Sequence, residues 1–480
     1  MLFNSLDFAI FLPIVFLIYW IACKNRYYQN TFLLLASYFF YGWWDWRFLF
    51  LIAASSFLDF TLGQRIFSSS DRKEKKRFLI ISIVFNLGML CFFKYLNFFI
   101  DSFVDSFNLM GASFSRRNLN IILPVGISFY TFQTLSYTID IYKGKLNPAR
   151  NMTSFFAFVS FFPQLVAGPI ERASNLLPQF DNKKEFSFKE CSNGLTQMLW
   201  GLFKKVVIAD SCAYHVNKIF TGYESIDSFF LIIGAILFVF QVYADFSGYS
   251  DIAIGTARLF GFRLMTNFKT PYFSTSWGEF WKRWHISLSS WILDYVYNPL
   301  VLSIRDWQAK GIVFALVLTF ILNGLWHGAN WTFIVFGFLL GLFISTEFIL
   351  RFQRKNLSKR IGKRNMSILG WFVVMITWTL ACILFRAESL THAINYMRLI
   401  VDPSNWIIQR YKGLQYLLQV FFFISMMLCI DWKGKNFDYS LFFIRNYKNS
   451  FLRWSCYIFL CCMIGLYMET NDQPFIYFQF

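Results

Sequence analysis

Four histidines are the side chains of this sequence whose chemistry is easiest to place: His215, His285, His327 and His392. Imidazole is the group best suited to take up or release a proton near neutral pH. The histidines are far apart in the sequence, and none belongs to a His–Glu motif, whereas zinc sites draw on clustered ligands. We therefore expect no metal site and look for proton-transfer chemistry instead.

His327 lies between two apolar runs, in the segment 321–337 (ILNGLWHGANWTFIVFG). An ionisable side chain at membrane depth is costly and usually faces a cavity or a partner. Two interpretations stay open from this residue alone: a catalytic base, or a core histidine bonded to a backbone carbonyl. Its neighbours Asn323, Trp326 and Asn330 are candidates for contact with a substrate.

His285 follows Trp284 in a segment rich in tryptophan and cations, 279–300 (EFWKRWHISLSSWILDYVYNPL). Aromatic rings and cations together are typical of the headgroup region of a membrane. The segment is therefore predicted to be an amphipathic interface helix. The alternative is that His285 is a second polar group lining the route of a substrate.

Two carboxylates, Asp245 and Asp251, lie in the apolar segment 241–255 (QVYADFSGYSDIAIG). Unpaired charges there would be expensive. We expect them to pair with nearby cations, for which the candidates are Lys204, Lys205, Lys282 and Arg283. A structural role is favoured over a catalytic one, and Asp245, Asp251 and Trp284 are also candidates for lining a substrate tunnel.

The elements that must position these residues are membrane helices. Of 480 residues, 56% are hydrophobic and only 15% are charged, against about 25% charged in soluble proteins. Apolar runs such as 229–240 are continuous, whereas an outer-membrane barrel would alternate polar and apolar residues. The sequence lacks the glycine-rich phosphate loops and the GxSxG elbow, so nucleotide hydrolysis and serine-hydrolase chemistry are not expected.

The positions of the charged residues predict how the chain is oriented in the membrane. The net charge of +18 is assigned to cytoplasmic loops and lipid headgroups rather than to nucleic acid. The cationic loops 71–77 and 351–364 are predicted to be cytoplasmic, which places the N-terminus outside. We predict an all-α polytopic protein of about 11 spans in one domain. The runs 153–170, 194–209, 250–263 and 286–302 are expected to be re-entrant or buried among other helices.

Together these segments resemble the membrane-bound O-acyltransferase (MBOAT) superfamily, and within it the bacterial branch that acetylates alginate, peptidoglycan and exopolysaccharides. The resemblance runs from Met1 to about Ala387, with a motif-bearing core at 120–387. It is carried by LPVGISFYTFQ (123–133), FFPQLVAGPIERA (161–173), GLFKKVVIAD (201–210), QVYADFSGYSDIAIG (241–255), EFWKRWHISLSSW (279–291) and GLWHGANWTF (324–333).

The resemblance implies an all-helical fold around a central funnel or tunnel, in a bacterial cytoplasmic (inner) membrane. It implies that His327 is the catalytic histidine and His285 the second family histidine. The implied donor is a cytoplasmic acyl thioester, most simply acetyl-CoA, with no bound cofactor. The implied acceptor is a hydroxyl of an extracytoplasmic polysaccharide, reached with an esterase-like partner protein.

The hypothesis for the mechanism is that His327 acts as general base on the acceptor hydroxyl. A covalent acyl-histidine is the alternative. Asn323, Asn330 and tryptophan N–H groups are candidate donors to the developing oxyanion.

Two departures from the alginate pattern leave the acceptor open: Leu293-Asp294-Tyr295 stands where that branch has Arg-Asp-Tyr, and Val301-Leu302-Ser303 where it has Gly-Gly-Asn. The competing interpretations are D-alanyl transfer from a carrier protein to teichoic acid and, outside the enzymes, a transporter or flippase. The sequence shows no internal repeat of the kind that many transporters have.

Overall fold

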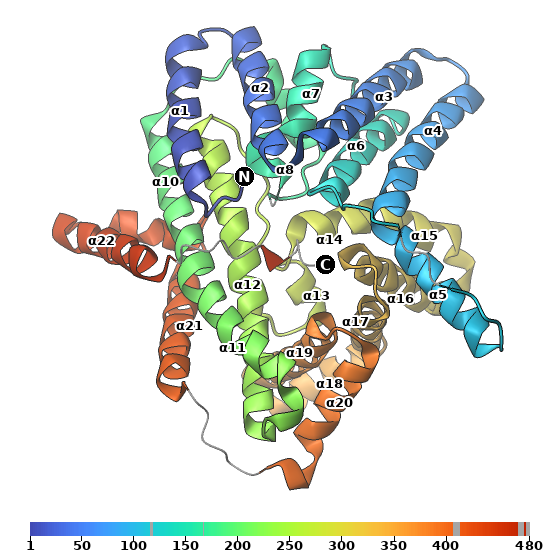
Figure 1. The fold of residues 1–480 in the computed structure, drawn as a ribbon, viewed down its shortest axis with the longest axis vertical. Helices are drawn as coiled ribbons and strands as arrows, with labels where there is room; N and C mark the ends of the chain where they lie inside the picture. The colour runs from blue at the N-terminus through green and yellow to red at the C-terminus, as the bar shows by residue number, and fades with distance from the viewer. Residues whose placement is uncertain (116–118, 167, 407–412, 469–474, 477–480) are drawn as a thin grey trace. The chain divides into compact units, whose positions relative to one another are not determined.

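The structure is a computed structural model that describes the chain except for residues 116–118, 167, 407–412, 469–474 and 477–480. Every regular element among the described residues is a helix (Figure 1). This confirms the predicted all-α class. The segment 161–173, one of the motifs that carry the resemblance, contains Ala167, which lies outside the described residues.

The helices form two compact units, Met1–Leu195 with Ala253–Met265, and Thr196–Ile252 with Thr266–Phe480. The first unit contains α1 (Leu6–Ala22), α2 (Arg26–Asp45), α3 (Leu49–Ser68), α4 (Arg72–Leu90), α5 (Leu96–Leu109), α6 (Ile127–Tyr142), α7 (Met152–Ser160), α8 (Phe162–Leu165), α9 (Ala173–Leu176) and most of α10 (Phe188–Leu202).

A buried polar cluster joins three helices of the first unit. The Asp59 carboxylate of α3 is fully buried and accepts hydrogen bonds from Ser82 Oγ (2.6 Å) and Asn86 Nδ2 (2.8 Å), both on α4. Thr134 of α6 donates to Asn86 Oδ1 at 3.2 Å. Since a buried polar group is costly unless it is hydrogen-bonded, these contacts hold α3, α4 and α6 side by side (Figure 1).

The second unit contains all the residues of the candidate site. Its helices are most of α12 (Ser228–Leu259), α11 (Asp210–Thr221), α13 (Trp277–Trp281), α14 (Ile286–Ile292), α15 (Asn298–Ser303), α16 (Gln308–His327), α17 (Trp331–Ile349), α18 (Arg351–Ile361), α19 (Lys363–Arg386), α20 (Leu390–Val401), α21 (Leu414–Gly434) and α22 (Ser450–Tyr467).

Eight helical stretches among the described residues are long and apolar enough to cross a membrane: Arg26–Ser68, Arg72–Leu109, Ser228–Leu259, Arg305–His327, Trp331–Ile349, Lys363–Arg386, Leu414–Gly434 and Ser450–Tyr467. Two shorter apolar helical stretches, Leu6–Ala22 and Met152–Leu165, accompany them. The count of about 11 spans stays a prediction.

The structure differs from the sequence analysis at α12. The run 250–263 was expected to be re-entrant or buried among other helices. It is mostly buried, and its residues up to Leu259 continue α12, which is unbroken over 32 residues. The polar residues inside α12 do not end the helix because its two carboxylates, Asp245 and Asp251, are paired with lysines. Pairing removes the reason for a polar break in an apolar helix.

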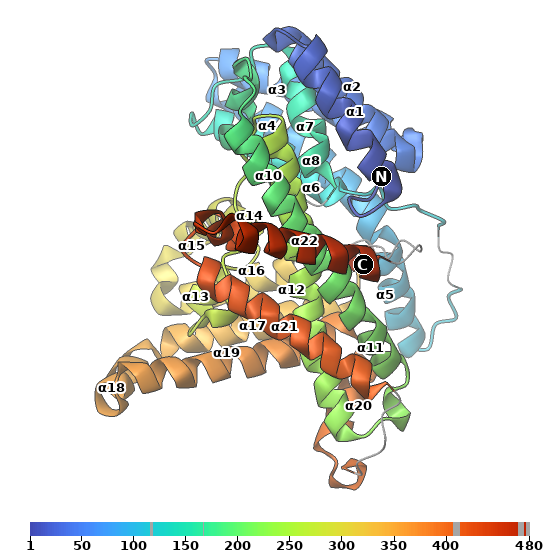
Figure 2. The same ribbon diagram turned by 90° about the vertical axis from the view of Figure 1, so that its left-hand side faces the viewer.

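A tight hairpin of α16 and α17 places the residues between them. Gly324 and Gly337 face each other, and a Cβ on Gly337 would lie 2.2 Å from the carbonyl oxygen of Phe320. A contact that short is impossible, so the two backbones approach closely only because glycine stands at both positions. α19 packs beside α17, as both views show (Figures 1 and 2).

We predict that Gly337→Ala destabilises the protein. The added methyl must push α16 and α17 apart, and overpacking of this kind costs about 1–3 kcal/mol. The measurement is the thermal unfolding midpoint of the detergent-solubilised protein, which should fall. Gly465→Ala in α22 is the matched control, because no atom lies within 4 Å of its added Cβ. An equal midpoint change in both variants would show that the hairpin contact does not matter.

Candidate active site

His327 is held at the end of a helix. It is the last residue of α16, and 6% of its surface is exposed. Three residues later Asn330 begins α17 as its N-cap, with its Oδ1 accepting a hydrogen bond from the Thr332 backbone N–H at 3.0 Å. The turn between the two helices therefore fixes the backbone on both sides of the imidazole.

The His327 side chain forms part of the lining of a small pocket in the second unit. The other lining residues are apolar or aromatic and come from α12, α17, α19 and the segment around α13: Phe238, Val242, Trp281, Trp284, Phe336, Trp378, Cys382 and Phe385. The rings of Phe385 and Phe336 lie 5.4 and 6.1 Å from the imidazole, between ring centres. Such a lining excludes water and strengthens electrostatic interactions inside the pocket.

Two of the aromatic side chains that line this pocket carry a polar indole N–H group. The Nε1 atoms of Trp281 and Trp378 are buried and have no hydrogen-bond partner among the described residues. Indole nitrogen can only donate a hydrogen bond, and buried donors without a partner are rare. The pocket thus combines a proton acceptor, His327, with two residues that carry unused donors.

The segment 279–300, predicted to be one amphipathic interface helix, is interrupted by a turn. α13 ends at Trp281, a turn follows, and α14 begins at Ile286. His285 lies in the turn with a φ of 41°, a left-handed conformation that is uncommon outside glycine, and only 1% of it is exposed. The prediction of one continuous helix was wrong, and two tryptophans of this segment, Trp284 and Trp291, are buried.

The two histidines approach the same indole. The ring centre of Trp326 lies 5.9 Å from that of His285 and 5.1 Å from that of His327. Burial lowers the pKa of His285 well below its usual range, and the neighbouring His327 lowers it further. His285 is therefore neutral at physiological pH. Both residues were predicted from the sequence, and the structure places both beside the Trp326 ring.

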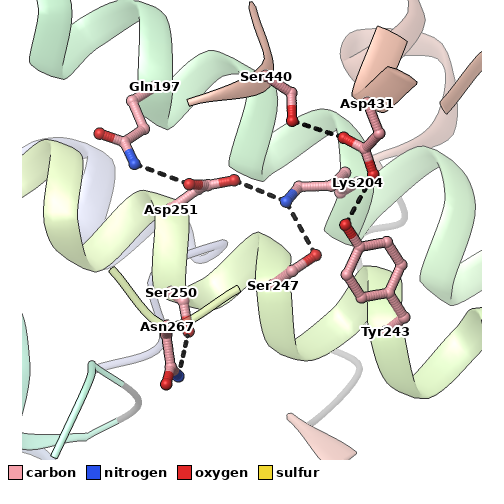
Figure 3. Close-up of polar contacts among 9 residues, drawn as sticks. All are labelled: Gln197, Lys204, Tyr243, Ser247, Ser250, Asp251, Asn267, Asp431 and Ser440. Carbon is pink, nitrogen blue, oxygen red and sulfur yellow. Dashed lines mark hydrogen bonds and ion pairs between the residues drawn. The ribbon is translucent and has the colours of Figure 1, made fainter. Parts of the chain in front are cut away.

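The predicted partners of the two carboxylates are confirmed. Lys204 donates to Asp251 Oδ2 at 2.6 Å and to Ser247 Oγ at 2.8 Å, while Gln197 Nε2 donates to Asp251 Oδ1 at 2.7 Å (Figure 3). Lys205 lies 2.9 Å from Asp245. Lys282 and Arg283 are not needed here, and Arg283 pairs with Glu279 at 2.7 Å instead.

The lysines belong to a π-helical segment, Phe203–Ala209, directly after α10. Lys205 also pairs with Asp210 at 2.7 Å. Burial by itself lowers the pKa of Lys205, but its two carboxylate partners raise it above the ordinary value. The π-helical segment lies close to α12 because Gly201 and Gly248 meet backbone to backbone, where a Cβ on Gly201 would be 2.6 Å from the Gly248 oxygen.

Sequence analysis missed two residues of this region. Asp431 of α21 is 1% exposed and accepts hydrogen bonds from Tyr243 Oη (2.7 Å) and Ser440 Oγ (2.6 Å) (Figure 3). A lone acid at the end of the apolar run 413–431 was the signal for it. Asn267 is fully buried and contacts His285, and no sequence pattern marked it.

The remaining predicted residues fall into two groups. Trp284 lines the pocket, and Asn323 is buried one turn before His327, with its Oδ1 lacking a hydrogen-bond partner among the described residues. Asn330 is a helix cap whose Nδ2 donates to the Glu388 carbonyl at 3.2 Å. Within the described part of the chain, no group of three or more His, Cys, Asp or Glu side chains could hold a metal ion.

Known proteins resemble this chain over most of its length. The membrane-bound O-acyltransferase family matches residues 147–387. A probable alginate O-acetylase AlgI of Azotobacter vinelandii is 38% identical over 85% of this chain and 79% of the relative. A peptidoglycan O-acetyltransferase of Helicobacter pylori is 35% identical over 83% of this chain and 79% of the relative.

A more distant relative is a teichoic acid D-alanyltransferase of Bacillus subtilis, 28% identical over 45% of this chain and 57% of the relative. All of these proteins are named as transferases of an acyl or aminoacyl group. Both histidines of the candidate site lie inside the family match.

We predict that Lys204→Met destabilises the protein by about 3–5 kcal/mol, because it leaves the Asp251 carboxylate without its cation. The double variant Lys204→Met/Asp251→Asn removes both charges and should recover part of the loss. The measurement is the thermal unfolding midpoint of the solubilised protein, with Lys355→Met on exposed α18 as control. A double variant no more stable than Lys204→Met would contradict the ion-pair explanation.

Proposed function

The chain belongs to the membrane-bound O-acyltransferase family, and we propose that it moves an acetyl group from acetyl-CoA to a hydroxyl of a cell-surface polysaccharide. It is a multi-pass membrane protein and an O-acyltransferase that acts on polysaccharide hydroxyls. The identity of the donor and of the particular polysaccharide belongs to the proposal.

The proposal for the site rests on one observation. The buried imidazole of His327 lines a pocket whose other lining residues are apolar or aromatic and carry no charge. A neutral imidazole in such a pocket can accept a proton without competition from water.

The proposed reaction has one bond formed and one broken. His327 removes the proton from the acceptor hydroxyl as its oxygen attacks the thioester carbonyl, forming the C–O bond. The tetrahedral intermediate then collapses, the C–S bond breaks, and the imidazolium returns the proton to the departing thiolate. If His327 acted as a nucleophile instead, the protein would become labelled by acyl donor in the absence of acceptor.

The indole N–H groups of Trp281 and Trp378 support this chemistry as donors to the developing oxyanion. Fixed donors in a water-excluded site act strongly on a charge that appears only in the transition state. Asn323 and Asn330 were expected in the same role. We now place Asn323 as a residue supporting His327 and Asn330 as a helix cap, and we assign the oxyanion contact to the tryptophans.

The proposal also includes the orientation of the protein in the membrane, its location and its partner. The cationic segments 71–77 and 351–364 support a cytoplasmic side for both loops, an extracytoplasmic N-terminus and entry of the donor from the cytoplasm. We place the protein in a bacterial inner membrane and treat 1–480 as one catalytic domain. An extracytoplasmic, esterase-like partner would carry the acetyl group to the polymer.

D-alanyl transfer to teichoic acid is the competing donor and acceptor pair, and the Bacillus subtilis relative named for it is 28% identical over 45% of this chain. Supplying a D-alanyl carrier protein in place of acetyl-CoA separates the two. The transporter interpretation is set aside, because the chain belongs to a family of transferases.

We predict that His327→Ala lowers acetyl transfer by about 10²–10⁴-fold, the usual contribution of a general base. Labelled acetyl-CoA is supplied to inside-out and right-side-out membrane vesicles, together with the polysaccharide fraction, and esterified product is counted. Transfer should need donor on the cytoplasmic face. His392→Ala, a histidine outside the pocket lining, is the matched control.

Full transfer by His327→Ala would refute the assignment of the base. Transfer that depends on donor at the outer face would refute the proposed orientation. No transfer by wild-type vesicles with acetyl-CoA, but transfer with a charged carrier protein, would replace the proposed donor.

We predict that Trp281→Phe and Trp378→Phe each lower kcat, by up to about 10²–10³-fold, with little change in KM. Phenylalanine keeps an aromatic ring in the wall but removes the N–H that the oxyanion needs. Phe336→Leu is the control for altered packing, because it disturbs the same pocket without removing a donor. If the tryptophan variants raised KM and left kcat unchanged, the rings would serve binding alone.

A further inference from the structure

His285 is held from one side by a buried amide. Its Nδ1 lies 3.0 Å from Asn267 Oδ1. Asn267 is 0% exposed and His285 is 1% exposed, so solvent does not compete for this contact. The two residues lie 18 positions apart, on either side of α13, in the same unit.

Neighbouring hydrogen-bonding groups fix the orientation of the Asn267 amide. The Ser287 backbone N–H can only donate, and it lies 3.4 Å from Asn267 Oδ1, with Ser287 Oγ at 2.9 Å. On the opposite side, Asn267 Nδ2 donates to Ser250 Oγ at 3.0 Å (Figure 3). A flipped amide would set two donors, Nδ2 and the Ser287 N–H, against each other.

Because Oδ1 has no hydrogen to give, the proton of this contact must sit on His285 Nδ1. A neutral imidazole carries one N–H, so Nε2 keeps its lone pair. His285 Nε2 is buried and has no hydrogen-bond partner among the described residues. A buried acceptor without a partner destabilises the protein, and a hydrogen-bond donor on the substrate would remove that cost.

We propose that Asn267 is a positioning residue that holds His285 as the Nδ1–H tautomer, so that Nε2 accepts a hydrogen bond from the substrate during acyl transfer. This rests on the proposed function, in which His327 is the base for acyl transfer, and on the position of His285 beside the same Trp326 ring. The attacking hydroxyl has one hydrogen, which His327 removes, so the hydrogen bond to His285 Nε2 comes from a second hydroxyl of the acceptor sugar.

The surroundings keep the ring in place and leave it uncharged. Phe246 of α12 meets the imidazole edge to face at 4.6 Å, Phe268 lies at 6.3 Å, and Trp326 of α16 at 5.9 Å. From α16, the titratable group that acts on His285 is His327.

From α12, the acids Asp245 and Asp251 are each bound to a lysine. The segment that follows α12 contributes the neutral Asn267. No carboxylate among the described residues is hydrogen-bonded to His285.

The test compares Asn267→Asp with wild type across pH 5–9. Aspartate keeps the acceptor for Nδ1–H, but its charge stabilises the imidazolium and should raise the lowered pKa of His285. Protonated Nε2 cannot accept a hydrogen bond, so the acidic limb of kcat/KM that His285 causes should move to higher pH in the variant and enter the measured range. At pH 9 the variant should regain most of the wild-type rate.

Asn267→Ala should lose activity at every pH without moving the limb, and Asn365→Asp, an exposed residue of α19, should leave the profile unchanged. A purely structural role for Asn267 predicts the same loss at every pH for Asn267→Asp. That result would overturn the proposal.

A second measurement does not depend on activity. Nitrogen NMR of wild-type protein labelled in its four histidines, assigned with His285→Gln, reports which ring nitrogen carries the proton. We expect a bare Nε2 at His285, and a protonated Nε2 would refute the proposal. If wild type shows this tautomer yet transfers no acyl group, the proposed function fails while the tautomer assignment stands.

Discussion

The site depends on the requirement that charges buried beside α12 be paired. Lys204 and Lys205 are almost fully buried, and each is bound to a carboxylate of α12. Removing one partner from such a pair costs far more than the pair contributes, so the contacts fix the register of α12 against the π-helical segment Phe203–Ala209. The close approach of Gly201 and Gly248 makes the pairing geometrically possible.

Once the position of α12 is fixed, its side chains at intervals of four residues determine which of them face the pocket and which face the charged network. Residues four apart lie on one face of a helix. In one row, Phe238 and Val242 line the pocket. In the same row, Phe246 packs against His285, and Ser250 accepts a hydrogen bond from Asn267. The neighbouring row of Tyr243, Ser247 and Asp251 meets Asp431 and Lys204 (Figure 3). The same helix therefore separates the charged network from the apolar pocket.

The sequence predicted what residue type and local context determine. His327 and His285 stood out because ionisable groups are rare in apolar sequence, and the lysine partners of Asp245 and Asp251 followed from the cost of unpaired charge. It did not predict contacts made by folding, such as Asn267 with His285 or Asp431 with Tyr243. It also separated the run 250–263 from the helix before it and predicted one helix over 279–300, because hydropathy does not report which faces become buried.

The choice of an amide at position 267 follows from the charge that acyl transfer creates. As His327 takes the proton, an imidazolium and an oxyanion appear together, and their attraction is about 4 kcal/mol at 4 Å for an effective dielectric constant of about 20. A second positive charge at His285, beside the same Trp326 ring, would oppose that protonation. A carboxylate at position 267 would favour such a charge, whereas Asn267 orients the imidazole and leaves it neutral. The His327 imidazolium and the oxyanion can then attract each other in the low-dielectric pocket without opposition from a charged His285.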